Sequence, residues 1–382
     1  MANEFQDRIK KKEKEKESAG KSTNSANKKS VKREIIEFAL IIFVIVPFIN
    51  MFIMQSYAIP TSSMEGEMLI GDRLFVSKIN YGARIPMTPI ALPYVHNKIG
   101  NSPSYTEAIK LPYYRLPGLS SIKRNDIVVF NYPGDKVTGM PVDKRENYIK
   151  RCVGIAGDTL SVKGSDVFIN GKASLHPPLS QYRYMVKAKD PGGINPKVWE
   201  DLGVREILGQ TDDGRFMMLL TDDNAAKMKT MPAFESVDKM LETPGKGEPQ
   251  VYPQNPNSNW NVDYFGPIYL PKRGDKVKID SSNYLLYAPA IRDYEGNTNV
   301  AWNNAEKKIS INGQLTDTYE FKMNYYFMMG DNRHNSLDSR YWGMVPEDHI
   351  VGTPVFVWLS TNDQAKGWGD WIRWNKSFRF VK

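Results

Sequence analysis

The sequence has few residues of two types that commonly build enzyme sites, cysteine and histidine. Cys152 is the single cysteine among 382 residues, so an internal disulfide and a cysteine-based zinc site are both excluded. A lone cysteine fits a reducing compartment and equally fits a bacterial exported domain, so it does not decide the compartment. The four histidines are His96, His176, His334 and His349. A hydrolase that depends on histidine would therefore have few candidates for its base.

Apolar residues are nearly absent from the first 33 residues, which cannot form a core. This tail holds eleven Lys/Arg against five Asp/Glu, whereas the whole chain carries a net charge of +8. Such a run can bind nucleic acid or a lipid surface, or it can be a solvated tail that sets membrane orientation. The sequence that follows favours the solvated tail, and we expect no nucleic-acid partner.

Long apolar runs are also scarce, because only one approaches the length of a membrane span. Phe38 to Met54 is apolar apart from Asn50, and its flanks extend it to roughly 20 residues, enough for a ~30 Å hydrocarbon layer. Pro47 predicts a kink, which membrane helices tolerate. A cleaved secretion signal would have a shorter apolar core and small residues at its end. The pattern therefore predicts an uncleaved transmembrane anchor at 34–57.

The basic residues beside this run predict its orientation. They are expected to hold the tail, 1–33, in the cytoplasm, so that everything after Tyr57 lies on the far side of the membrane.

The remaining chain has the composition of a β-rich body, with 12% aromatics and 24 prolines. Strands are predicted at Asp126–Pro133 and in a hairpin at 158–172 that turns at Gly164-Ser165-Asp166. Further strands are predicted in 275–290 and 306–315, and the best helical window is 222–242. The polar, proline-bearing stretch from about 175 to 267 is interpreted as an insertion.

The C-terminal segment carries Trp368, Trp371 and Trp374 at steps of three beside several cations. This pattern suits a bilayer interface, and it equally suits a terminal segment that packs its aromatic side chains on the β body.

A serine-containing stretch, AIPTSSMEGEM at 58–68, follows the apolar run directly. Serine is a poor nucleophile unless a base takes its proton, and no histidine lies nearby in the sequence. A neutral lysine could serve if burial lowered its pKa from ~10.4, and a two-unit shift costs about 2.7 kcal/mol. Lys150 lies among apolar neighbours in ENYIKRCVGIAGD, 146–158. The simpler interpretation of that window is a strand with Lys150 pointing outward.

Four motifs in order, IPTSSM, RNDIVVFNYP, YIKRCVGIAGD and FMMGDNRHNSLDSRYWGMVPEDHIVG, follow the apolar run. With these motifs the chain resembles bacterial type I signal peptidase, a family of serine–lysine dyad peptidases. The GDNRxNSxDSRYWGxVP pattern is highly specific for that family, and IKRxVGxxGD is nearly as specific. The resemblance covers 58–68, 124–172 and 326–357, which is less than half of the chain beyond the anchor.

The resemblance implies a role for each matching residue. Ser63 matches the nucleophile and Lys150 the general base. Thr61, where the family commonly has serine, and the Ser63 backbone N–H match the oxyanion hole. Ser336 matches a hydroxyl that holds the lysine amine in place, and Asp338 and Arg340 match a charged pair that supports this loop. The walls of shallow substrate pockets are expected to include Ile59, Pro60, Met64, Tyr148 and Ile149.

The sequence departs from the family pattern in three places. Glu65 and Glu67 follow the nucleophile, and they would raise the lysine pKa unless both carboxylates face away. His334 stands where the family often has aspartate, so a histidine triad with Asp331 or Asp338 is an alternative. The stretch 175–322 is longer than the family pattern needs.

The resemblance implies a mainly β fold, an antiparallel-sheet catalytic body with a large insertion, preceded by one transmembrane helix. We expect a body at 58–174 and 323–360, an insertion with additional strands at 175–322, and a Trp-rich basic tail at 361–382. It further implies an endopeptidase that removes signal peptides from exported preproteins after small residues of the Ala-x-Ala type, without metal or organic cofactor.

The same resemblance implies the surroundings of the protein. It places the chain in the bacterial inner membrane, in contact with the lipid bilayer and with preprotein signal peptides. It also implies that the chain lies close to the export translocon. The rival interpretations are an inactive interaction protein on the same scaffold, a self-cleaving repressor, which should carry a DNA-binding segment and no anchor, and a histidine-dependent hydrolase.

Overall fold

A computed structural model describes residues 31–135, 139–190, 196–205, 207–362, 365 and 367–381. Most of the basic tail, residues 1–30, lies outside this part of the chain. The first described element is an apolar helix that runs from Val31 to Phe52, with a mean hydropathy of 2.5 in its most apolar window. It consists of α2 (Val31–Leu40), a π-helical turn η1 (Ile41–Ile45) and α3 (Val46–Phe52). The irregular turn directly precedes Pro47, which lacks the N–H that a regular helix would use.

The predicted boundary of the anchor was wrong at its C-terminal end. Residues Met54–Ala58 form strand β1 and pair with β2 (Asp72–Ser77), Met54 opposite Ser77. Gln55 and Ser56 interrupt the apolar run there, and their backbone groups are satisfied in the sheet. The apolar helix therefore ends at Phe52, and the first strand of the body begins two residues later.

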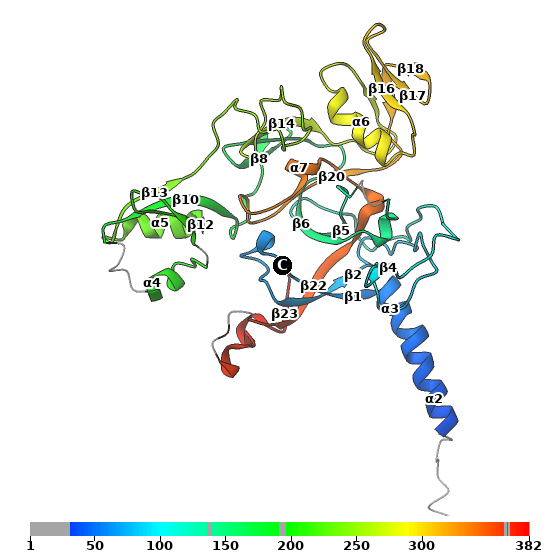
Figure 1. Cartoon of the computed structure of the whole chain (residues 1–382), viewed down its shortest axis with the longest axis horizontal. Helices are drawn as coiled ribbons and strands as arrows, with labels where there is room; N and C mark the ends of the chain where they lie inside the picture. Colours follow the sequence, from blue (N-terminus) through cyan, green and yellow to red (C-terminus); the bar gives the residue numbers. More distant parts are fainter. Residues whose placement is uncertain are drawn as a thin grey trace, which may run out of the picture. The chain divides into compact units, whose positions relative to one another are not determined.

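The central sheet of the body, shown in Figure 1, is antiparallel with the strand order β1-β2-β22-β5-β6-β20-β21, and β23 pairs with β22. Its further strands are β5 (Ile127–Asn131), β6 (Asn147–Gly154), β20 (Tyr325–Met329), β21 (Val345–Pro346), β22 (Ile350–Ser360) and β23 (Arg379–Phe380). All five residues of β5 are buried, as expected for the continuous apolar run IVVFN. The mainly β, antiparallel fold predicted from the sequence is confirmed.

A second sheet carries the predicted hairpin at 158–172. Its strand order is β14-β7-β8-β9, with bounds β7 (Thr159–Lys163), β8 (Asp166–Ile169), β9 (Lys172–Ala173) and β14 (Tyr264–Tyr269). Gly164 and Ser165 form the two-residue turn, and both have positive φ, 61° and 72°. This is the requirement of a type I′ hairpin turn, so the predicted hairpin is confirmed.

A third sheet, with the order β11-β12-β10-β13, lies within the predicted insertion. Its elements are β10 (Gln181–Ala188), α4 (Pro196–Asp201), β11 (Ile207–Gln210), β12 (Arg215–Thr221), α5 (Asp222–Thr230) and β13 (Phe234–Lys239). Helix α5 contacts β10, β12 and β13, and their apolar side chains form a separate core cluster (Figure 1). The helix predicted over 222–242 ends before Pro232, and its second half is instead strand β13.

The segment 275–290 was predicted as strand, and this was largely wrong. Only β15 (Lys276–Lys278) is extended, and α6 (Tyr284–Asp293) is a helix. Short apolar runs do not distinguish a strand from a buried helix by periodicity alone. The neighbouring strands are β16 (Val300–Asn303), β17 (Lys308–Ile311), β18 (Gln314–Thr316) and β19 (Thr318–Glu320). Residues of α6 and β17 share one apolar core with the β7–β8 hairpin and β20.

The C-terminal segment contacts the body through Arg373 and through the Phe380 ring, whose centroid lies 5.2 Å from that of Phe356. Its 3-10 turns are η5 (Trp368–Asp370) and η6 (Trp374–Lys376). Arg373 donates to Ile70 O at 2.5 Å and to Thr361 O at 2.6 Å. Trp371 and Trp374 are 56% and 65% exposed. These two rings are thus largely exposed, and their contact with lipid stays a prediction.

Candidate active site

The candidate nucleophile lies on a short turn between the first two strands of the central sheet. Ser63 belongs to the 3-10 turn η2 (Ser62–Met64), and Thr61 precedes it in extended conformation with φ −132° and ψ 157°. Thr61 Oγ1 lies 3.5 Å from Ser63 Oγ. The turn is held by backbone bonds on both sides, including Ile59 N–H to Asp72 O at 2.9 Å and Met68 N–H to Met64 O at 3.0 Å. Ser63 is 8% exposed, so its hydroxyl sits in a fixed and largely dry position.

Lys150 reaches this hydroxyl from strand β6. Its Nζ lies 2.7 Å from Ser63 Oγ and donates to Ile149 O at 3.0 Å. The residue is 4% exposed, and the Tyr148 ring lies 5.5 Å from the amine. The structure thus brings together the two residues that the motifs single out, although 87 positions separate them in the chain. The outward-facing lysine on a strand is excluded.

Burial of Lys150 lowers the pKa of its amine from 10.5 to about 8, while Asp338 and Asp331 oppose the shift. Loss of water disfavours the charged form, and the nearby carboxylates restore only part of its stability. At pH 7 about a tenth of the amine is therefore uncharged and can accept the Ser63 proton.

The two opposing carboxylates are each engaged by an arginine. Asp331 accepts two bonds from Arg151, at 2.8 Å and 2.6 Å. Asp338 accepts two from Arg340, at 2.9 Å and 2.8 Å. Such bidentate pairing neutralises a carboxylate and fixes its position. The sequence predicted the pair Asp338–Arg340 but missed Arg151–Asp331. One hint of this pair is present in the sequence: Arg151 follows Lys150 on the same strand, and an arginine that becomes buried there needs an acidic partner.

The loop after β20 closes over the candidate nucleophile. Asn332 N–H donates to Ser63 O at 3.1 Å. Ser336 is 9% exposed, and a Cβ on Gly330 would collide with both Ser336 Oγ and Ser63 O, so these three residues are in close contact. Ser336 Oγ is buried and has no hydrogen-bond partner among the described residues. Ser336 therefore lies beside the dyad without a bond to Lys150.

The adjacent hydroxyl of Ser62 points to a different partner. Its Oγ accepts from Asn335 Nδ2 at 3.2 Å, and its carbonyl accepts from Asn332 Nδ2 at 3.3 Å. Ser62 is therefore part of the contact with the loop, and its hydroxyl bonds to Asn335 rather than to the lysine.

The two glutamates that follow the candidate nucleophile are paired with arginines from distant segments. Glu65 Oε1 lies 3.4 Å from Arg205 NH1 of the insertion, and Glu67 Oε1 lies 3.9 Å from Arg379 NH1 of the C-terminal strand. Burial, Asp338 and Asp331 account for the pKa of Lys150, and neither glutamate is among its causes. The condition stated for these carboxylates, that they face away from the amine, is met.

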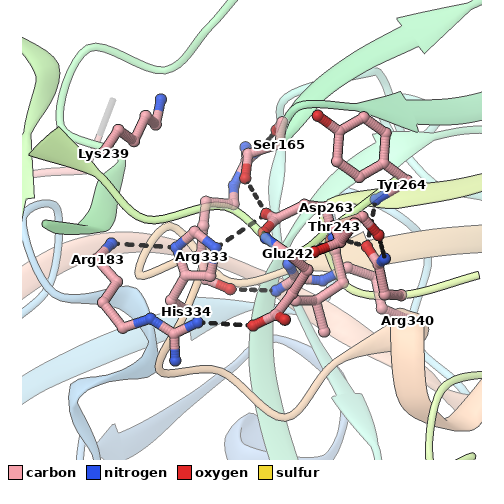
Figure 2. A network of polar contacts seen from close by, with 12 residues as sticks. Ser165, Arg183, Lys239, Glu242, Thr243, Asp263, Tyr264, Arg333, His334 and Arg340 are labelled. Atoms are coloured by element: carbon pink, nitrogen blue, oxygen red, sulfur yellow. Dashed lines mark hydrogen bonds and ion pairs between the residues drawn. The ribbon is translucent and has the colours of Figure 1, made fainter. Parts of the chain in front are cut away.

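His334 makes a different set of bonds from those a triad with Asp331 or Asp338 would need. Figure 2 shows it between Arg183 and Asp263. Its Nδ1 accepts from the Arg183 backbone N–H at 3.1 Å, and its Nε2 lies 2.9 Å from Asp263 Oδ1. Both ring nitrogens are thereby occupied, and its side chain is only 1% exposed. His334 joins the loop to the insertion and to the strand β14 region.

The residues proposed for substrate pockets fall into two groups. Ile59 and Met64 belong to the core cluster beneath the turn, with Ile149 packed against it. Tyr148 belongs to another cluster, stacked on Tyr132 with ring centroids 4.6 Å apart. Pro60 is exposed. Pro60 and Ile149 are thus accessible, whereas Ile59 and Met64 are buried, at 4% and 0% exposed.

Comparisons with known proteins identify the family of the chain. The family model described as "Signal peptidase, peptidase S26" matches residues 32–236 and 271–359. The chain is 26% identical over 341 residues to Signal peptidase I of Buchnera aphidicola subsp. Schizaphis graminum, covering 87% of this chain and 76% of that protein.

Two further relatives are similar over comparable lengths. Signal peptidase I of Helicobacter pylori is 26% identical over 350 residues, covering 88% of this chain and 89% of the relative. Signal peptidase I of Haemophilus influenzae is 23% identical over 376 residues, covering 95% and 81%.

Proposed function

Since the chain belongs to the peptidase S26 family of signal peptidases, we propose that it is a membrane-anchored serine endopeptidase that removes signal peptides from exported preproteins. The observation that carries this proposal is the 2.7 Å contact between Ser63 Oγ and a buried Lys150 Nζ. A hydroxyl beside an amine whose pKa is lowered to about 8 is the arrangement that serine–lysine acyl transfer requires.

In the proposed reaction the neutral Lys150 amine takes the proton from Ser63 Oγ. The oxygen then attacks the peptide carbonyl, and the charge that develops on the carbonyl oxygen is stabilised by the Thr61 hydroxyl and the Ser63 backbone N–H. Protonated Lys150 gives its proton to the leaving amine. Water, deprotonated by Lys150, hydrolyses the ester and frees Ser63.

The other side chains are assigned supporting roles. Ser336 lies against Gly330 beside the dyad, and we assign it to orienting the lysine amine during the reaction. The buried pairs Asp338–Arg340 and Arg151–Asp331 hold the loop that carries Ser336.

The proposed substrate is an extended segment with small residues before the cut. We propose that the accessible Pro60 and Ile149, with the buried Ile59 behind them, form shallow walls which accept alanine or glycine and reject larger side chains. Met64 and Tyr148 support these walls from the core clusters in which they pack. An extended peptide can add its backbone to a strand edge.

The location follows from the apolar helix Val31–Phe52 and the family. We propose a bacterial inner membrane protein with a cytoplasmic N-terminus and its catalytic body outside. Ser63 is only eleven residues beyond Phe52, so the chain itself would keep the site near the membrane surface where signal peptides end. Contact with the export translocon is consistent with this location.

The test uses the full chain in detergent with a preprotein that carries its signal peptide. We expect the wild-type chain to release the mature protein after a small residue, read by N-terminal sequencing, and Ser63→Ala to leave the preprotein intact. The two proteins should melt at similar temperatures, which separates loss of chemistry from loss of fold. No cleavage by the wild-type chain would favour an inactive interaction protein, whereas undiminished cleavage by Ser63→Ala would exclude Ser63 as the nucleophile.

A further inference from the structure

A cavity of about 260 Å³ lies beside the loop that follows β20. It is bordered by the β8–β9 hairpin, by the segment that leads into β10 and by the first residue of α5. Its titratable lining residues are Asp166, His176, Asp222 and Arg333. Neither Ser63 nor Lys150 borders it, so this cavity has no part in the proposed chemistry.

Arg333 brings a buried positive charge to the wall of this cavity. The residue is 2% exposed, and no carboxylate forms an ion pair with it in the part of the chain that the structure describes. Its Nε has no hydrogen-bond partner there, and its NH1 makes one long bond, of 3.5 Å, to Ser165 O. Arg340 of the same loop shows the usual arrangement, since it bonds twice to Asp338. A buried charge without a counter-charge is costly, so the unpaired guanidinium indicates an anionic ligand.

The backbone at Arg333 is held from both sides, which fixes where its side chain begins. Its N–H donates to Gln181 O at 2.9 Å, and its carbonyl accepts from Arg340 NH2 at 2.5 Å. Gln181 N–H in turn donates to Asp331 O at 2.8 Å. Because these bonds use backbone atoms of residue 333, replacement of its side chain leaves them in place.

Two carboxylates also border the cavity, and they limit which anions it can take. Asp222 accepts from the Tyr184 hydroxyl at 2.5 Å and from Lys239 Nζ at 3.1 Å, so its charge is largely offset. The Asp166 side chain is 59% exposed and lies 3.7 Å from His176 Nδ1. Burial lowers the pKa of His176, so this ring is mostly neutral at pH 7 and adds no second cation. The remaining negative charge disfavours a doubly charged phosphate more than a singly charged carboxylate.

Much of the remaining wall is apolar. It includes Val153 and Val167, which are 2% and 7% exposed, and also Ala173 and Leu175. A planar carboxylate matches the two-pronged guanidinium, and a short apolar stem matches these side chains. The cavity is smaller than the roughly 300–1,000 Å³ of sites for drug-sized ligands, so it suits a single side chain or a small acid.

The cavity and the dyad are neighbours through two segments of the chain. His176 borders the cavity, and three residues later a Cβ on Gly66 would collide with Leu179 O, close to the turn that carries Ser63. On the other side, the residue before Arg333 donates its N–H to Ser63 O at 3.1 Å. An acidic side chain on a peptide held at Ser63 is therefore one source of the ligand.

We propose that the cavity is a carboxylate-binding site, in which the Arg333 guanidinium pairs with a carboxylate on a short apolar stem. Two sources share this chemistry: a glutamate or aspartate side chain in the mature part of a bound preprotein, and a small free carboxylic acid. The first source rests on the proposed function and would make the enzyme favour preproteins with an acidic residue at that place. The second source is independent of the proposed function.

The first test measures binding by thermal unfolding of the full chain in detergent at pH 7. Butyrate carries the apolar stem and the charge of a glutamate side chain, and butyramide is its neutral counterpart. We expect butyrate to raise the Tm by roughly 1–3 °C over butyramide at equal ionic strength, because a ligand that binds only the folded chain stabilises it. Arg333→Gln should abolish this difference, and Arg215→Gln, which changes an exposed arginine, should keep it.

Two outcomes of this test would overturn the proposal. One is the absence of a butyrate response in the wild-type chain, and the other is a response that survives in Arg333→Gln. A larger response to inorganic phosphate than to butyrate would exclude the carboxylate assignment.

A second pair of variants leaves Arg333 unchanged, so it decides the matter even if Arg333→Gln does not fold. Ala173 lies on β9 and lines the cavity. Ala173→Glu supplies a tethered carboxylate that should occupy the site and abolish the butyrate response. Ala173→Gln has the same size without the charge and should keep the response. Equal responses of these two variants would contradict the proposal.

The last measurement distinguishes the two sources. Two preproteins that differ only by glutamate or glutamine in the first residues of the mature part are cleaved by the wild-type chain and by Arg333→Gln. For the preprotein source, the wild-type chain should cleave the glutamate form with a several-fold higher kcat/KM, through a lower KM, and Arg333→Gln should cleave both forms equally. Equal cleavage by the wild-type chain, together with a butyrate response, would assign the site to a free carboxylate. Failure to cleave either preprotein would contradict the proposed function, while the butyrate response would still decide whether the site exists.

Discussion

Two buried clusters of this chain place a serine hydroxyl beside ionisable side chains, and they differ in what the hydroxyl meets. In the first, Ser63 Oγ lies 2.7 Å from the Lys150 amine. In the second, shown in Figure 2, Ser165 donates to Asp263 Oδ1, and the same oxygen lies 2.9 Å from His334 Nε2. The second cluster contains the three residue types of the familiar hydrolase triad, whereas the first contains only two residues.

The comparison shows that residue types alone do not make a reactive hydroxyl. In the His334 cluster the Nδ1 lone pair is taken by the Arg183 backbone N–H, and the serine bonds directly to a carboxylate. No basic lone pair is left for the hydroxyl, so the cluster joins segments. In the Ser63 cluster burial makes the amine partly neutral, and its Nζ lies 2.7 Å from the hydroxyl oxygen.

The largest expected effect separates the two bases. Lys150→Ala should lower kcat/KM for preprotein cleavage by at least ~10³-fold, about 4 kcal/mol in the transition state, because the hydroxyl loses its only base. His334→Ala should retain most of the activity of the folded protein. Kinetics of both variants on one preprotein check this. If His334→Ala instead lost more activity than Lys150→Ala, the cluster around His334 would be the reactive one.

The second effect concerns stability. Asp263→Asn removes a carboxylate that accepts from Ser165 Oγ, His334 Nε2 and the Glu242 backbone N–H, so the free energy of unfolding should fall by ~1–3 kcal/mol. Denaturant titrations should show this lower free energy of unfolding, while the peptidase activity of the folded fraction should change only slightly. Asp213→Asn, an exposed partner of Arg215, is the control and should leave the midpoint unchanged. An Asp263→Asn chain that is equally stable would contradict a structural role.

The candidate pair Ser63 and Lys150 was predicted through the family resemblance, because the motifs that carry it are short and local. The turn that holds Ser63 and the strand that holds Lys150 are each contained in one short motif, and the hairpin at 158–172 follows from alternation and turn residues. The partners could not be predicted, because pairing across the fold leaves no local trace. Arg151 and Asp331 are 180 positions apart, and Glu65 meets Arg205 only after the insertion has folded.

The misassigned elements have a similar cause. The run at 284–293 is too short and too uniformly apolar for its period to choose between helix and strand. Residues Met54–Ala58 continue an apolar run, but their pairing with Asp72–Ser77 draws them into the sheet. In both places tertiary contacts decided the local structure.

The smallest expected effect tests how the insertion influences the reactive cluster. Arg205→Ala removes the guanidinium that lies 3.4 Å from Glu65 Oε1, so the segment that carries Ser63 gains net negative charge. The lysine pKa should then rise slightly, moving the acidic limb of the pH–rate profile upward by a few tenths of a pH unit. Glu65→Gln in the same chain should cancel the shift. Arg215→Ala is a matched control, since the Arg205 and Arg215 side chains are 45% and 44% exposed. If Arg205→Ala, the double variant and Arg215→Ala all showed the same shift of the pH–rate profile, Arg205 would have no specific effect on Lys150 through Glu65.

The central claim, that Lys150 acts as a neutral amine, is tested most directly by the pH dependence of kcat/KM for the full chain in detergent. With a pKa of about 8 the rate should rise with pH and reach half of its plateau near that value, because deprotonation of Lys150 produces the active form. At pH 7 about a tenth of the amine is neutral, so substantial activity should remain. A midpoint close to the ordinary lysine pKa of 10.5 would contradict the claim. So would a midpoint near 6.5 that disappears in His334→Ala.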